Sequence, residues 1–134
     1  MKDFGLILNN HSLKATPQRL EMLSIVDHIG HVSIDGLYSK LKTKFENISL
    51  ATIYKNVNSM VESKLLFEVK IPNAKSVYEI VKDDHSHLVC KSCNAVIDIK
   101  VNMDSMVNDI SFEYNFAVDR TDFILSGLCS GCRD

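Results

Sequence analysis

The sequence lacks any apolar run approaching the roughly 18 residues that a membrane-spanning helix requires, so we expect no membrane partner. It also lacks a recognisable leader, because residues 1–10 carry one base, one acid and no small-residue cleavage site. Internal repeats and low-complexity segments are missing as well. We therefore expect a cytoplasmic protein, in a reducing compartment where cysteines bind metals more often than they form disulfides.

A positive excess of charge is missing too, since the net charge is -2, but the charges are distributed unevenly. Residues 1–82 contain 11 Lys/Arg and 8 Asp/Glu (net +3), whereas residues 83–134 contain 4 and 9 (net -5). Hydrophobic residues form 46% and charged residues 24% of the 134 residues, which excludes extensive disorder. The asymmetry favours a nucleic-acid-binding module joined to a second module.

The first half of the sequence carries helix signals. Apolar residues over 4–10 predict a short first helix, and Thr16 followed by Pro17 predicts the start of a second helix that ends at Gly30. Ser33 and Ser49 are suitable N-caps for a third and a fourth helix. The predicted buried stripe of the second helix consists of Leu20, Leu23, Ile25, Val26 and Ile29.

The pattern then changes from helical periodicity to strands. Residues 66–71 and 76–80 flank Pro72-Asn73-Ala74-Lys75, which predicts a β-hairpin. Helices followed by a hairpin indicate a winged helix-turn-helix DNA-binding domain over residues 1–81, with 49–64 as recognition helix and the hairpin as wing. In residues 82–134 we expect strands over 87–90, 95–101 and 117–128, and a short helix near 103–110. The predicted fold class is therefore α+β, with an α/β second domain.

Two CxxC pairs, Cys90-Lys-Ser-Cys93 and Cys129-Ser-Gly-Cys132, are the strongest chemical signal. One such loop places two thiolates on a tetrahedral ion, and two loops complete the four-sulfur shell of structural Zn(II). A complete shell leaves no open position for catalysis. Two alternatives stay open, namely four unligated buried cysteines and a dithiol switch that responds to oxidants.

A second group of candidate ligands lies around the first CxxC pair. His85 and His87 alternate along a predicted strand, so both imidazoles are expected on one face. Glu79 lies upstream at the end of the hairpin, and Asp98 lies on the following strand. Imidazole combined with carboxylate suits Fe(II), Mn(II) or Zn(II). The alternative is a solvated acidic stretch with two surface histidines.

Taken in order, the motifs resemble those of the ferric uptake regulator (Fur) family over nearly the whole chain. The matching segments are Leu13-Lys-Ala-Thr-Pro-Gln-Arg19, His31-Val-Ser33, Asp35-Gly-Leu-Tyr38, Ser49-Leu-Ala-Thr-Ile-Tyr-Lys-Asn56, Ser76-Val-Tyr-Glu79, His85 to Cys93, Val96-Ile-Asp98 and Cys129 to Cys132. The resemblance implies a homodimer that binds a palindromic operator in double-stranded DNA, with residues 82–134 as dimerisation and metal-binding domain. It also implies Zn(II) on the four cysteines and a regulatory Fe(II) or Mn(II) on His31, Glu79, His85, His87 and Asp98.

The resemblance assigns DNA contacts as well. Lys14 would enter the minor groove, and Tyr54 with Lys55 would enter the major groove. The expected DNA-binding set is completed by Arg19, Ser49 and Thr52. The family often has Arg where this sequence has Lys55, and lysine lacks the bidentate fork that reads guanine, so we expect weaker base specificity there. His28 matches no ligand position and is interpreted as a helix-end histidine.

Two branches of the family compete for the interpretation. Asp98 resembles the peroxide-sensing repressor branch (PerR), whereas iron-sensing members usually have Glu at this position. Glu79 departs from that branch, which usually has Asp there. We predict a metal-dependent repressor that senses peroxide through oxidation of a ligating histidine, with His31 and His85 as the residues that are oxidised. The alternative is an iron-responsive regulator of metal uptake.

Other sites and functions are disfavoured. Many family members hold an additional metal with a histidine and an aspartate where this sequence has Thr121 and Ser86, so we expect that site to be absent. We predict no enzymatic activity, because the spaced H-x-E and Pro-Cys-x-x-Cys motifs of zinc deaminases are missing. A zinc-binding interaction module without DNA contact is a further alternative, against which the helix carrying Tyr54 and Lys55 argues.

Overall fold

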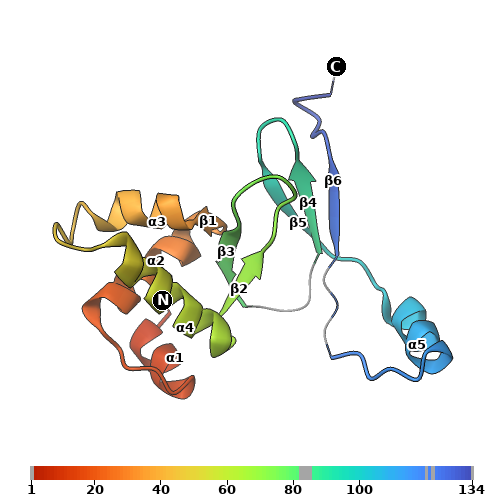
Figure 1. The fold of residues 1–134 in the computed structure, drawn as a ribbon, viewed down its shortest axis with the longest axis horizontal. Coiled ribbons are helices and arrows are strands. Elements are labelled where there is room, and N and C mark those ends of the chain that lie inside the picture. Colours follow the sequence, from red (N-terminus) through yellow and green to blue (C-terminus); the bar gives the residue numbers. More distant parts are fainter. Residues whose placement is uncertain (1, 82–85, 120, 122, 134) are drawn as a thin grey trace. The chain divides into compact units, whose positions relative to one another are not determined.

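The computed structural model describes residues 2–81, 86–119, 121 and 123–133, and the chain divides into two compact units, residues 1–82 and 83–134. The helices and strands (Figure 1) are α1 (Phe4–Asn10), α2 (Pro17–Ile29), β1 (Val32–Ser33), α3 (Ile34–Leu41), α4 (Leu50–Glu62), β2 (Leu66–Val69), β3 (Val77–Ile80), β4 (Ser86–Cys90), β5 (Val96–Ile99), α5 (Asp104–Glu113) and β6 (Ile124–Gly127). Helices combined with two three-stranded sheets confirm the α+β fold class.

The helices of the first unit begin at the predicted caps. The Thr16 hydroxyl accepts a hydrogen bond from the backbone N–H of Arg19 at 3.3 Å, and Pro17 is the first residue of α2. Gly30 ends α2 with φ of 96°, a left-handed conformation that costs glycine little. Ser33 and Ser49 cap α3 and α4 through their hydroxyls, so all three predicted helix starts are confirmed.

The core of the first unit lies between the helices and the hairpin. Leu23 of α2, Leu37 of α3 and Ile53 of α4 are fully buried in it. The prediction for Ile29 is wrong: this last residue of α2 is 42% exposed, while Met22 is fully buried. Spacing along a helix identifies a face, but it does not show how far along the helix the neighbouring elements reach.

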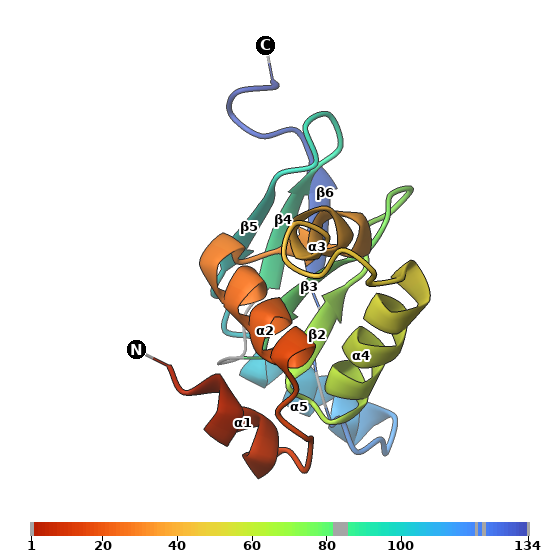
Figure 2. The ribbon, with the colours of Figure 1, turned by 90° about the vertical axis from the view of Figure 1, so that its left-hand side faces the viewer.

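A three-stranded sheet completes the winged helix of the first unit. The order is β1-β3-β2, and β2 pairs antiparallel with β3 from Leu66↔Ile80 to Val69↔Val77. The short β1, which sequence reasoning missed, pairs with β3 on its other side. Figure 2 shows α2, α3 and α4 around the β2–β3 hairpin. The paired strands are shorter than predicted because the connection between them begins directly after Val69.

The second unit has a sheet of order β5-β4-β6, in which β4 pairs antiparallel with β5 and parallel with β6. The long strand predicted over residues 117–128 is wrong, because β6 covers only Ile124–Gly127. Its partner β4 has five residues, and the pairing runs from His87↔Ile124 to Cys90↔Gly127. The α5 helix has no buried residue. Among the residues that the structure describes, no helix has the length and apolarity to cross a membrane.

Shortening one buried side chain tests the packing of the first unit. Leu23→Ala leaves a cavity between fully buried neighbours, so we expect the free energy of unfolding to fall by about 2–5 kcal/mol. Leu6→Ala on α1 is the matched control, because Leu6 is 56% exposed. Urea denaturation followed by circular dichroism measures both. Equal losses from the two variants would contradict the assignment of Leu23 to the core.

Candidate metal centres and DNA-reading helix

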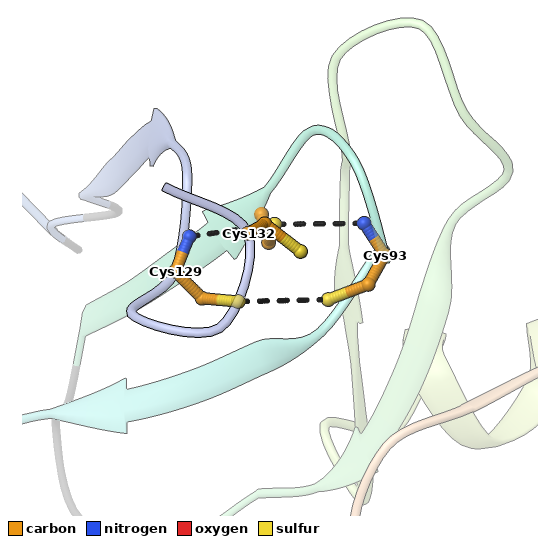
Figure 3. Close-up of side chains that lie close together, drawn as sticks. Cys93, Cys129 and Cys132 are labelled. Carbon is orange, nitrogen blue, oxygen red and sulfur yellow. Dashed lines mark hydrogen bonds between the residues drawn. The ribbon is translucent and has the colours of Figure 1, made fainter. Parts of the chain in front are cut away.

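Strand pairing brings the two CxxC pairs together. Cys90 ends β4, and the parallel register places Gly127 of β6 beside it, so Cys129 follows two residues further on. The Sγ atoms of the four cysteines all lie within 4.8 Å of one another. Figure 3 shows the side chains of Cys93 and Cys129 pointing toward one another, with 3.8 Å between their Sγ atoms.

The backbone around Cys90 favours its thiolate form. Its Sγ accepts hydrogen bonds from the backbone N–H of Cys93 at 3.5 Å and of Cys129 at 3.4 Å. These donors lower the pKa of Cys90 to about 6. At Cys132, a hydrogen bond with Ser92 lowers the pKa, but the three neighbouring thiols outweigh it and the net value rises to about 12.

The four cysteines have the donor set and the proximity that structural zinc requires. All four are free thiols in the structure, so no disulfide competes for them. Four thiolates so close together would repel one another, and a bound metal cation offsets this repulsion. Zinc binding therefore coincides with the loss of the thiol protons. The dithiol switch stays a hypothesis. Two observations are compatible with it: Cys93 is exposed, and its Sγ lies 3.8 Å from that of Cys129.

A histidine–carboxylate pair forms inside the first unit. His31 lies between the end of α2 and β1, and the register Val32↔Tyr78 brings it next to Glu79 of β3. The distance from Nε2 of His31 to Oε2 of Glu79 is 2.7 Å. Glu79 is only 1% exposed, so its carboxylate depends on such a partner in the interior.

A second pair of the same kind forms inside the second unit. His87 of β4 lies directly opposite Asp98 of β5, with 3.4 Å between Nε2 and Oδ1. His87 is 2% exposed. The predicted ligand His85 lies outside the described residues. His28 is exposed in the last turn of α2, which confirms its interpretation as a helix-end histidine.

The predicted reading helix α4 has a buried face and an outer face. Ile53, Val57 and Met60 are buried, whereas Tyr54 is 45% exposed and Lys55 is exposed. At its start, the Ser49 hydroxyl accepts a hydrogen bond from the backbone N–H of Thr52 at 3.1 Å. Ser49 and Thr52 therefore shape the beginning of the helix, and the outer face carries Tyr54 and Lys55.

The other two predicted DNA-binding residues lie together at the start of α2. Lys14 is exposed, and the backbone carbonyl of this residue accepts a hydrogen bond from Nη1 of Arg19 at 3.0 Å. The same guanidinium donates from Nε to Oδ1 of Asn56 at 3.0 Å. Sequence reasoning gave Asn56 no role, because nothing in the local pattern signals a contact between residues 37 positions apart.

Ser86 and Thr121 both line a cavity of about 250 Å³ in the second unit. The other lining side chains include Asp104 and Asn108 of α5. Hydroxyl and amide oxygens are harder donors than the imidazoles that favour transition metals. The residues of this cavity thus differ from those that hold the additional metal in the family pattern.

Removing one thiolate tests the zinc assignment. Cys129→Ser leaves three sulfur donors, so we expect zinc content to fall below one ion per chain and the second unit to lose stability. Zinc released by a denaturant is measured with a chromophoric chelator, beside thermal unfolding. Ser130→Ala, in the same loop, is the control. Full zinc content and unchanged stability in Cys129→Ser would exclude a four-cysteine centre.

Comparison with known proteins shows relatives of one kind. The chain is 30% identical over 127 residues to the peroxide operon regulator of Bacillus subtilis, covering 93% of this chain and 88% of that protein. It is 31% identical over 140 residues to the ferric uptake regulation protein of Vibrio parahaemolyticus, covering 100% of this chain and 94% of that protein.

Solved structures and a family description agree with these relatives. The Campylobacter jejuni peroxide stress regulator matches with a TM-score of 0.77 and 32% identity, covering 98% of this chain and 100% of that chain. The Vibrio cholerae ferric uptake regulator matches with a TM-score of 0.80 and 30% identity, covering 95% and 100%. The sequence model of the ferric uptake regulator family matches residues 10–126 of this chain. The chain therefore belongs to the ferric uptake regulator family.

Proposed function

We propose that the chain is a transcriptional repressor that senses peroxide through a metal held by residues of both units. Its family consists of metal-responsive transcriptional regulators that bind DNA as dimers, not of enzymes. Peroxide sensing in particular is supported by Asp98, which lies directly opposite His87 in the sheet. Aspartate at this position is the residue that resembles the peroxide-sensing branch, and the Bacillus subtilis relative is named a peroxide operon regulator.

The regulatory site in this proposal joins the two histidine–carboxylate pairs. The first unit contributes His31 with Glu79, and the second contributes His87 with Asp98, while His85 is the fifth ligand expected from the sequence. Nitrogen and carboxylate donors of this kind suit Fe(II) and Mn(II). Each pair already lies together within its own unit, which lowers the ordering cost of binding a cation.

Because the proposed ligands come from both units, binding of the ion is coupled to DNA binding. An ion that needs both pairs binds best to the arrangement of units that brings them to it, and its binding free energy increases the population of that arrangement. In a dimer, that arrangement sets two α4 helices at the spacing of the half-sites on a palindromic operator. Loss of the ion releases this constraint, and the DNA affinity falls.

Ferrous iron at these residues supplies the one-electron chemistry that activates hydrogen peroxide. The net change is the transfer of one oxygen atom from peroxide to an imidazole carbon of His31 or His85, with water as the other product. An oxidised imidazole is a poorer ligand, so the site loses the ion and the operator is freed. Because the oxidised ring is not reduced again at the site, the response is one-way for each molecule.

The second unit carries the surface that we propose for the dimer. Its helix α5 has no buried residue, and large apolar side chains in and after it are exposed, including Phe112 at 91% and Phe116 at 63%. Exposed apolar groups gathered in one segment mark an interaction site. The family works as dimers, so a second copy of residues 83–134 is the occupant that we assign.

As a regulator of transcription, the protein works in the cytoplasm with the DNA.

The second candidate function is an iron-responsive regulator of metal uptake. Glu79 favours it, since the peroxide-sensing pattern usually has Asp at this position. The Vibrio parahaemolyticus relative is named a ferric uptake regulation protein. Both functions use the same residues, and they differ in whether peroxide or the supply of iron removes the metal.

Metal dependence is tested with a DNA duplex selected by the manganese-loaded protein from a random-sequence library. Asp98→Asn keeps the shape of the side chain but removes its charge, so we expect half-maximal DNA binding to need at least about tenfold more Mn(II). His31→Ala should show the same shift although it lies in the other unit. Fluorescence anisotropy measures both. Asp119→Asn, at an exposed residue outside α5, is the matched control. Unshifted curves for Asp98→Asn and His31→Ala would rule out the shared site.

Peroxide sensing is tested by mass spectrometry of protein loaded with Fe(II) and treated with hydrogen peroxide. We expect one added oxygen atom on His31 or His85, because these imidazoles would hold the ferrous ion that activates the peroxide. Fragmentation of the tryptic peptide 20–40 separates His31 from His28, which should stay unmodified. Manganese-loaded protein is the control. Unmodified histidines together with iron-dependent DNA binding would favour the iron-responsive function.

A further inference from the structure

The segment that carries Lys14 is held to the core on both sides of the lysine. Leu13 and Ala15 are partly buried and pack against the core of the first unit, while Lys14 between them is exposed. The backbone N–H of Thr16 donates to the carbonyl of Lys14 at 3.1 Å. This segment thus presents the lysine outward from a fixed backbone.

Arg19 connects this segment with the reading helix. Its Nη1 donates to the carbonyl oxygen of Lys14, and its Nε donates to Oδ1 of Asn56 on α4, both at 3.0 Å. Arg19 is partly buried, and so is Asn56. A guanidinium is planar, and its N–H donors point in fixed directions, so one side chain can bridge two acceptors with defined spacing.

Asn56 is itself oriented by its helix. Its Nδ2 donates to the carbonyl oxygen of Thr52 at 3.0 Å, which directs Oδ1 toward Arg19. Thr52 in turn bonds to the capping hydroxyl of Ser49. A continuous chain of hydrogen bonds therefore runs from the Lys14 segment through Arg19 to the first turn of α4, next to Tyr54 and Lys55.

We propose that Arg19 and Asn56 form a clamp that fixes the position of Lys14 relative to the reading helix. Arg19 is then a positioning residue, which acts through Lys14 and Asn56 rather than through a DNA phosphate. The two grooves of a duplex lie at a set spacing, so side chains that enter both lose less freedom on binding when they are already held together. The inference rests on the proposed function and on the DNA contacts that the family resemblance implies for Lys14, Tyr54 and Lys55.

The test compares affinities of the manganese-loaded dimer for the selected duplex at several salt concentrations. The variants are Arg19→Lys, Arg19→Gln, Asn56→Ala, Lys14→Ala and the double variants that combine Lys14→Ala with Arg19→Gln or with Asn56→Ala. Gln18→Ala, beside Arg19, is the control. Thermal unfolding of each protein shows whether it is folded.

For a clamp, Arg19→Lys and Arg19→Gln both weaken binding about tenfold, a change of ~1.4 kcal/mol. Lysine keeps the charge but lacks the separated, fixed N–H donors with which a guanidinium spans these two acceptors. The dependence of affinity on salt stays unchanged. Lys14→Ala costs clearly less in the Arg19→Gln and Asn56→Ala proteins than in the wild type, since the lysine is already misplaced there. Asn56→Ala supplies the same comparison if an Arg19 variant fails to fold.

Three outcomes overturn the clamp. If Arg19→Lys binds like the wild type and Arg19→Gln lowers the salt slope by about one unit, Arg19 contacts a phosphate directly. If the losses from Lys14→Ala and the clamp variants simply add, the residues are independent. If Lys14→Ala binds as tightly as the wild type, the proposed minor-groove contact fails and the clamp has nothing to position.

Discussion

The pairing of β4 with both of its neighbours is the constraint on which the chemistry of this protein depends. Antiparallel pairing with β5 sets His87 opposite Asp98, and parallel pairing with β6 brings Cys129 and Cys132 back to Cys90. His87 and Cys90 lie three residues apart on the same strand. A zinc ion on the cysteines would therefore also hold in place the strand that presents His87, a ligand of the proposed regulatory metal.

Sequence predicted the features that local chemistry decides. The hydroxyl caps at Thr16, Ser33 and Ser49 and the glycine stop at Gly30 depend on the residue and its nearest neighbours, and all four are confirmed. The convergence of the cysteines was predictable because few arrangements other than a shared ion need two CxxC loops. His31, by contrast, was assigned as a ligand only through the family resemblance, because no local sequence pattern links it to Glu79.

Features that depend on a distant partner were not predictable in the same way. The length of β6 is limited by the five residues of β4, and β1 exists only because β3 has an edge next to it. The bridge from Arg19 to Asn56 joins residues from two helices, so it needs the packed fold before it can form. In each case the deciding residue is far away in the sequence, where periodicity and capping rules carry no information.

Burial in the second unit has a consequence for how the regulator matures. Of the residues described there, only Ser86, His87, Val89 and Cys90 are buried, and all four belong to β4. One short strand cannot bury enough apolar surface to offset the chain entropy lost on folding. Zinc on the four cysteines and, in the proposed dimer, a second copy would then supply the stability that this half of a newly made chain lacks. The cellular supply of zinc, together with the abundance of the protein itself, would thereby limit how many sensors are ready when the signal arrives.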